Sequence, residues 1–143
     1  MKRNLFLIAS SLGLITMCNA QIATNTQLTN TIWMYKNKED NLIRFLEFTN
    51  DSIWESSYRS YNHRIIRYSK PYYLSNDKNE PFDMKKVGTS TAGKYLLRWN
   101  MTMKEKEYCE ITTLTKDSLV LFFEAKPHYI GAADVYRTFK RVR

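Results

Sequence analysis

The sequence predicts an all-β protein whose strands form an antiparallel up-and-down β-barrel of about eight strands. Short apolar and aromatic runs recur roughly every 10 to 20 residues from Thr31 onward, with polar turn residues between them. Several runs alternate large and polar side chains with a period of two, as half-buried strands do. A closed barrel has no exposed strand edges, and this favours a barrel over the alternative, a two-sheet β-sandwich.

Size and composition limit the chain to one domain. It has 143 residues, of which 43% are hydrophobic and 14% aromatic, enough bulky side chains to close a core. This excludes a globally disordered chain and a repeat array. We expect three parts: a signal peptide at 1–20, a loose N-terminal segment at 21–30 and the barrel domain at 31–143.

The first twenty residues resemble a secretory signal. Lys2 and Arg3 precede an apolar stretch over 5–17, and the segment ends in Cys18-Asn19-Ala20. The stretch is too short for a bilayer core, which needs about 20 residues, so we expect no transmembrane segment. The prediction is export to the periplasm or the medium, with a lipoprotein anchored at Cys18 as the minor alternative.

Cleavage after Ala20 would leave Cys109 as the only cysteine, so no disulfide can form within the exported chain. We expect Cys109 to be a small buried side chain on a strand, and an intermolecular bridge is the alternative. The 22 Lys and Arg residues exceed the 14 Asp and Glu residues, and most of this basic excess lies outside the signal segment.

Strands are expected in the first half at 31–36, 42–49 and 53–59, with Asn50-Asp51-Ser52 as a tight turn between the last two. Pro71 cannot donate a ladder hydrogen bond. We therefore expect two short edge strands around it, at 64–68 and 72–74. Further strands are expected at 82–87, 94–102, 107–115, 118–125 and 135–142.

Alternation assigns the faces of two strands. Over 94–101 the large side chains fall on alternate positions, which places them on the inner face; these are Tyr95, Leu97, Trp99 and Met101. The same rule places Leu119, Leu121 and Phe123 inside. Both faces of that strand are apolar, so we expect its outer face to be covered as well.

Three segments resemble the small lipocalin-like β-barrels that bacteria export. They are 28–33 (LTNTIW), similar to the opening of the first barrel strand, 114–121 (LTKDSLVL), similar to a hairpin near the barrel's end, and the closing 135–141 (VYRTFKR). Thr31 stands where the opening motif has glycine. The resemblance implies that Trp33 plugs the closed end of the barrel, with Arg137 or Arg141 stacked on its indole.

Catalytic and metal-binding patterns are missing from the sequence. His63 and His128 stand apart from any carboxylate or cysteine at metal-ligand spacing, and no nucleophile, phosphate or dinucleotide motif occurs. We therefore expect no enzyme activity, no metal and no cofactor.

Two sets of residues are candidates for binding. Aromatic side chains of the lumen and its rim form the expected ligand-binding set: Trp54, Tyr58, Tyr95, Trp99 and Phe123. Basic side chains among tyrosines at 58–73 form an expected anion-binding surface, because guanidinium groups grip carboxylate or phosphate; these are Arg59, Arg64, Arg67 and Lys70.

The leading expectation is an exported, non-catalytic lipocalin-like module that binds a small hydrophobic or amphipathic molecule. The alternative is a protein or envelope interaction module, with a filled barrel and a Tyr- and Arg-rich surface that contacts an anionic glycan or a lipid phosphate. Export makes nucleic acid a poor partner for this basic surface.

Overall fold

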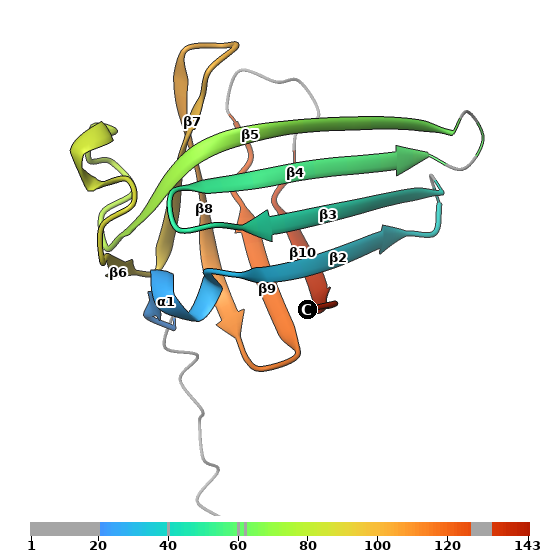
Figure 1. Ribbon diagram of the computed structural model, residues 1–143, viewed down its shortest axis with the longest axis horizontal. Helices are drawn as coiled ribbons and strands as arrows, with labels where there is room; N and C mark the ends of the chain where they lie inside the picture. The colour runs from blue at the N-terminus through green and yellow to red at the C-terminus, as the bar shows by residue number, and fades with distance from the viewer. Residues whose placement is uncertain (1–20, 40, 60, 62, 127–132) are drawn as a thin grey trace, which may run out of the picture.

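The protein is an all-β chain whose main feature is a closed antiparallel barrel, shown in Figure 1. The computed structural model describes residues 21–39, 41–59, 61, 63–126 and 133–143. The predicted signal peptide, Cys18 and His128 lie outside these ranges. The predicted eight-stranded barrel is confirmed, and the sandwich alternative is excluded.

The barrel is a meander in which each strand pairs with the next one along the chain, and the last returns to the first. Closure is made where Lys140 lies opposite Met34 and Arg141 opposite Trp33. The strands are β2 (Thr31–Asn37), β3 (Leu42–Phe48), β4 (Ser52–Arg59), β5 (Arg64–Ser75), β7 (Tyr95–Asn100), β8 (Glu105–Leu114), β9 (Ser118–Phe123) and β10 (Val135–Arg141).

The predicted break at Pro71 is wrong, because β5 is one strand of 12 residues. Its first part pairs with β4 as far as Pro71 opposite Ser52, and its last part pairs with β7 from Tyr72 onward. Pro71 therefore lies where the strand changes partners, a position that tolerates a missing backbone donor better than mid-ladder. The closed barrel leaves no edge strand there.

The segment at 21–30, which we expected to be loose, is packed against the barrel. It forms β1 (Ala23–Thr24) and one helical turn, α1 (Asn25–Leu28). Ala23 and Leu28 are fully buried in the core, and the Gln21 side-chain amide both donates to and accepts from the backbone of Leu114, at 2.7 Å each. Burial of two apolar side chains outweighs the polar composition of this segment.

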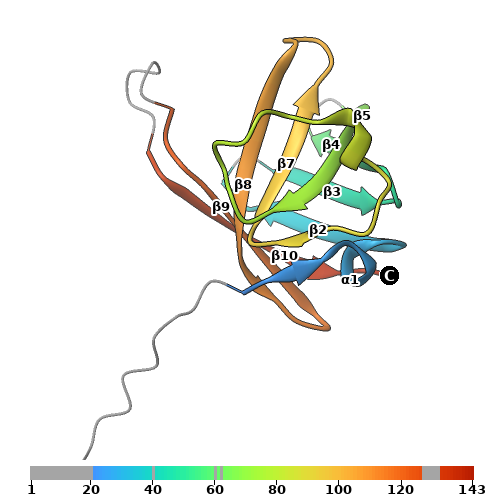
Figure 2. The ribbon, with the colours of Figure 1, turned by 90° about the vertical axis from the view of Figure 1, so that its left-hand side faces the viewer.

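β1 pairs with β6 (Ala92–Gly93) in a small second sheet. The long connection before β6 holds a single 3₁₀ turn, η1 (Met84–Lys86), where we expected a strand at 82–87. Figure 2 shows this connection passing in front of β7. Phe82 packs there between the rings of Tyr73 and Trp99, with centroid distances of 5.0 and 5.7 Å.

The predicted faces of β7 are wrong, because the 76–91 connection covers part of its outer face. Leu96 and Arg98 face the lumen, opposite Cys109 and Glu107 of β8. The large residues at 95, 97 and 99 face outward, where the 76–91 connection shelters part of them, and Leu97 is fully buried. Met101 lies in the exposed β7–β8 turn.

The apolar core fills one end of the barrel, which we call the closed end. Trp33 is fully buried there, and its Nε1 donates to Thr31 Oγ1 at 2.7 Å. The Arg141 guanidinium lies 5.9 Å from the Trp33 ring centroid, the contact that the sequence resemblance implied for one of two arginines. On β9, Leu119 and Leu121 face inward as predicted, and Cys109 is a fully buried free thiol.

Candidate functional site

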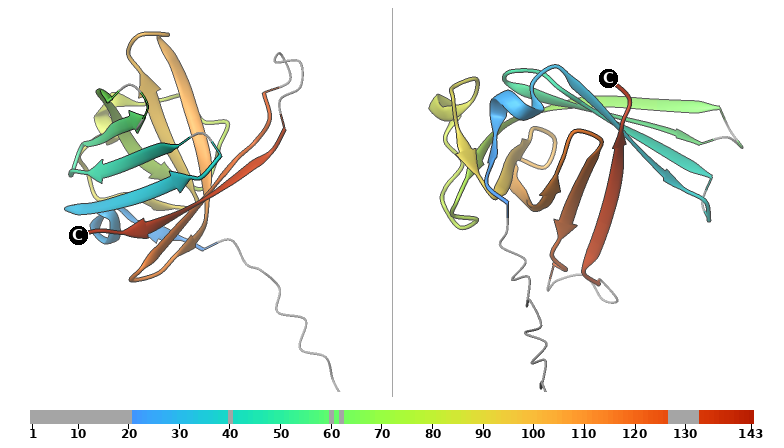
Figure 3. Two further views of the ribbon diagram at one scale, coloured as in Figure 1. Left: turned by 90° about the vertical axis from the view of Figure 1, so that its right-hand side faces the viewer. Right: turned by 90° about the horizontal axis from the view of Figure 1, so that it is seen from below.

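The opposite end of the barrel, which we call the mouth, is hollow. The ends of β2, β4, β7 and β9 and the starts of β3, β5, β8 and β10 lie at this end, because neighbouring strands are antiparallel. Figure 3 shows β2, β3, β4 and β5 extending away from α1. A cavity of about 600 Å³ occupies the lumen between the mouth and the apolar core. This volume lies within the range of ligand pockets, roughly 300 to 1,000 Å³.

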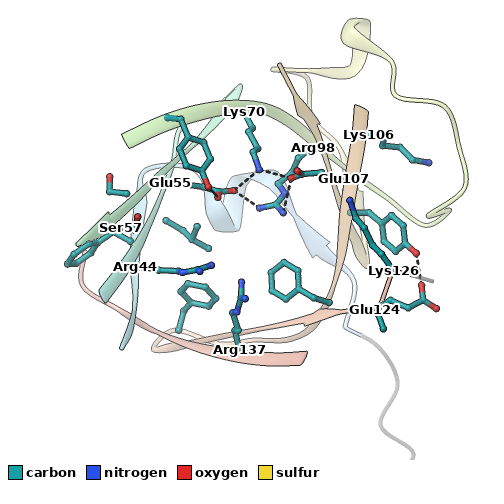
Figure 4. Close-up of a pocket in the computed structure, with 18 residues that line it drawn as sticks. Arg44, Glu55, Ser57, Lys70, Arg98, Lys106, Glu107, Glu124, Lys126 and Arg137 are labelled. Carbon is teal, nitrogen blue, oxygen red and sulfur yellow. Dashed lines mark hydrogen bonds and ion pairs between the residues drawn. The ribbon is translucent and has the colours of Figure 1, made fainter. Parts of the chain in front are cut away.

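Four charged side chains form an ion network on one wall of the cavity, as Figure 4 shows; we call Glu55, Lys70, Arg98 and Glu107 the lumenal ion network. Arg98 Nη1 donates to Glu55 Oε1 at 2.5 Å, and its Nη2 lies 3.3 Å from Glu107 Oε2. Lys70 Nζ donates to Glu107 Oε2 at 2.6 Å and lies 3.7 Å from Glu55 Oε1. The two cations and two carboxylates balance in charge.

Neutral donors complete the network. The Tyr68 hydroxyl donates to Glu55 Oε2 at 2.7 Å, and the Asn100 amide donates to Glu107 Oε1 at 2.8 Å. Burial, together with the charge of Glu55, raises the pKa of Tyr68 to about 12. Burial acts to raise the pKa of Glu107, but hydrogen bonds from Lys70 and Asn100 outweigh it, so this pKa lies below 4.5. Glu107 is therefore ionised at neutral pH.

Two further arginines, Arg44 of β3 and Arg137 of β10, point into the cavity from the other walls (Figure 4). Among the described residues neither forms an ion pair with a carboxylate. The Arg44 Nε is buried without a hydrogen-bond partner. Burial and the nearby positive charge of Arg44 lower the pKa of Arg137. Among the side chains that point into it, the cavity thus holds two half-buried cations in excess of its carboxylates.

Apolar side chains form the rest of the wall. Phe123, Phe139 and Leu46 line the cavity beside the arginines. The Arg137 guanidinium lies 4.8 Å from the Phe123 ring centroid, and the Tyr35 and Phe139 rings are 5.6 Å apart. One compartment therefore offers both an aromatic surface and unmatched positive charge, the combination that suits an amphipathic molecule.

A second hollow of about 210 Å³ continues the lumen toward the mouth along β4 and β5. It shares Arg44 with the main cavity and adds Arg59, Arg64 and Ile66. Arg59 and Arg64 lie opposite each other in the ladder and are exposed at the mouth. Their charges make the entrance to the lumen positive.

Of the five predicted ligand-binding residues, the structure places only Phe123 at the cavity wall. Trp54 lies outside the barrel, where the Arg67 guanidinium stacks 4.5 Å from its ring centroid. The Tyr58 hydroxyl meets His63 Nδ1 at 2.9 Å on the outer side of the hairpin. Tyr95 and Trp99 pack against Tyr108 and Phe82 on the outer face of the barrel.

The four predicted anion-binding residues do not form one surface. Arg59 and Arg64 flank the mouth, and Lys70 lies deeper in the lumen, where it pairs with Glu107. Arg67 projects to the outside and pairs with Glu47 at 3.1 Å. Alternation along β5 separates Arg67 from the others, because a shift of three residues reverses the face.

Sequence reasoning missed Arg44, Glu55, Arg98, Glu107 and Arg137. A signal existed in the strands themselves, because Arg44 and Arg98 sit between large apolar neighbours in the runs LIRFL and LLRWN. An arginine within such a run is either exposed on a polar face or buried with a partner. The pairing of distant strands decides between the two.

Among the described residues, no three His, Cys, Asp or Glu side chains gather as a metal site would require. Within the same ranges, no helix has the length and apolar character needed to span a membrane. Neither finding assigns an activity.

No protein-family model, curated protein or solved structure matches this chain. The geometry of the lumen is therefore the basis for the function proposed below.

Proposed function

We propose that the protein is an exported, non-catalytic binding module of the lipocalin-like kind, which holds a small amphipathic molecule in the open half of its lumen. The observation that carries the proposal is the cavity of about 600 Å³, which an aromatic wall and buried charges line together. A purely apolar ligand would desolvate Arg44 and Arg137 without giving them a partner, at a cost in free energy.

The filling of the barrel also supports a binding role. Buried apolar side chains, Trp33 and Phe139 among them, fill the closed end of the barrel. The side chains nearer the mouth leave the cavity between them. The lumenal ion network holds its own side chains in position through mutual contacts, and such pre-organisation lowers the ordering cost when a ligand binds.

The test introduces a bulky side chain on the cavity wall, where it would occupy the space of a ligand. Ser57 faces the lumen opposite Arg44, whereas Ser69 of β5 pairs with the outward-facing Trp54 and does not line the cavity. The uncharged dye N-phenyl-1-naphthylamine should gain fluorescence with the native protein and with Ser69→Trp, and should lose it with Ser57→Trp. Equal dye binding by both variants, with both folded by circular dichroism, would overturn lumenal binding.

A second candidate function is contact with the cell envelope through the tips at the mouth. Large apolar side chains are exposed there on three hairpins: Tyr61 and Ile65 on β4–β5, Met101 and Met103 on β7–β8, and Val135 and Tyr136 at the start of β10. Arg59 and Arg64 add positive charge beside the first pair. Apolar tips with basic flanks favour an anionic lipid surface.

This candidate predicts co-sedimentation with phosphatidylglycerol vesicles and little with phosphatidylcholine vesicles. Tyr61→Ser with Ile65→Ser should reduce the bound fraction, while Trp54→Ser, on the outer wall away from the tips, should not. The same bound fraction for all three proteins would exclude the tips as the contact.

A further inference from the structure

The charges in the lumen identify the chemistry of the ligand's polar end. This inference rests on the proposed lumenal binding. Of the charged side chains that point into the cavity, four are cations and two are carboxylates: Arg44, Lys70, Arg98 and Arg137 against Glu55 and Glu107 (Figure 4). The ion pairs of the network account for Lys70 and Arg98.

Charged groups at the rim do not neutralise the remaining two. Lys126 pairs with Glu105 at 3.2 Å, and Glu124 pairs with Lys78 at 2.9 Å on the outer side. The Lys106 ammonium donates to two backbone carbonyls of the 76–91 connection. The positive excess of the cavity therefore stays with Arg44 and Arg137.

The surroundings of these two arginines leave part of their hydrogen-bonding capacity unused. The Arg44 Nε is buried and has no hydrogen-bond partner, and the Arg137 guanidinium lies over the ring of Phe123, 4.8 Å from its centroid. Their strands, β3 and β10, flank β2 in the barrel wall, and Tyr35 of β2 lies beside Arg44 in the ladder. Two half-buried like charges repel, and a bound anion would relieve this repulsion.

We propose that Arg44 and Arg137 together form the binding site for the oxyanion head group, a carboxylate or a phosphate, of an amphipathic ligand whose apolar part lies against Phe123, Phe139 and Leu46. Guanidinium forks match the planar spacing of such oxygens. Arg59 and Arg64 at the mouth attract the same charge toward the lumen.

The experiment compares ligands that share one chain and differ in head group. Decanoate, decyl phosphate and 1-decanol are titrated into the purified protein by isothermal titration calorimetry, in an amine buffer near pH 7 at about 20 and 200 mM salt. Decanoate or decyl phosphate should bind at least about tenfold more tightly than decanol, since hydrogen bonds to charged groups exceed neutral ones by this order. The tighter of the two anions identifies the head group.

Variants locate the site. Arg44→Gln and Arg137→Gln should each reduce the affinity for the anions about tenfold or more and leave that for decanol unchanged. Arg137→Lys keeps the charge and should restore part of the affinity. The matched control is Arg67→Gln on the outer face, which should bind like the native protein. Thermal unfolding of each variant checks its fold.

The outcomes separate the two proposals. Equal affinity for decanol and both anions would overturn the oxyanion site and leave lumenal binding intact. Tighter anion binding that survives both glutamine variants but weakens strongly with salt would also overturn it, in favour of Arg59 and Arg64 at the surface. Failure of all three ligands to bind would overturn lumenal binding itself, and with it the oxyanion site.

Discussion

Arg98 and Glu55 lie 43 positions apart in the chain, yet the guanidinium Nη1 and the carboxylate Oε1 are 2.5 Å apart inside the barrel. The contact crosses from β7 to β4 over β5. Each of these side chains is largely withdrawn from water, with 9% and 16% of the side chain exposed. The pair therefore depends on the pairing of β4 and β7 with β5, and burial in the lumen leaves each charge dependent on the other.

Removing one member of this buried ion pair should lower the stability of the protein substantially. Glu55→Gln leaves the Arg98 charge buried with a weaker acceptor, so we expect the free energy of unfolding to fall by about 3 to 5 kcal/mol. Glu47→Gln breaks the exposed pair with Arg67 and should cost less than about 1 kcal/mol. Urea denaturation followed by circular dichroism measures both, and similar losses would contradict the burial of the lumenal pair.

Glu107 should make stability depend on pH in the acid range. Its pKa lies below the ordinary 4.5, so its contribution is fully present above that pH and is lost as the pH falls through the folded-state value. Glu107→Gln should therefore be destabilised relative to the native protein at neutral pH, and the difference should shrink as the pH falls below 4.5. A difference that is constant with pH would show that Glu107 does not titrate in this way.

Trp33 and Trp99 offer a matched test of the two sides of the barrel wall. Trp33 is fully buried in the core, and Trp33→Ala should cost about 3 to 5 kcal/mol. Trp99 is only partly buried, on the outer face beside Phe82, so Trp99→Ala should cost clearly less. Chemical denaturation that ranks the two variants in the reverse order would contradict the observed face of β7.

Gly93 is required by a close approach of two backbones. A Cβ at this position would lie 2.2 Å from the carbonyl group of Ser75, so Gly93→Ala should cost at least about 1 to 3 kcal/mol. At Gly88 a Cβ would have space, 3.6 Å from the nearest atom, and only the positive φ of 75° opposes it. Differential scanning calorimetry should show the larger fall in melting temperature for Gly93→Ala.

Cys109 should resist thiol reagents while the barrel is folded. It is fully buried beside the lumenal ion network, and burial raises its pKa to about 11. In the Cys18→Ser variant, Ellman's reagent should react only at the rate of unfolding. Rapid reaction under native conditions would indicate an open path to the thiol through the cavity.

The strand pattern predicted the barrel well because spacing and turn residues are local properties. The Asn50-Asp51-Ser52 turn and the inward positions of Leu119 and Leu121 followed directly from them. The inner face of β7 could not be predicted in this way. Its large residues at 95, 97 and 99 lie on the outer face, which the 76–91 connection partly covers. Alternation separates two faces but does not say which one a distant loop covers.

The candidate site was harder to predict for a related reason. Aromatic residues looked like the natural wall of a ligand cavity, yet Trp54 stacks outside on Arg67. The residues that do line the cavity include charges from β3, β4, β5, β7, β8 and β10. Arg44 and Arg98 stand out within apolar runs, but which charges meet in the lumen follows only from the register of the closed sheet.

The anchoring of Gln21 to Leu114 and of Arg143 to Ile32 fixes both ends of the described chain near the closed end, as the C-terminal mark in Figure 3 illustrates. A surface, resin or fusion partner attached at Gln21 or at Arg143 would thus hold the protein at its closed end. The entrance to the lumen would then point outward into the medium, which suits immobilised capture experiments without further engineering.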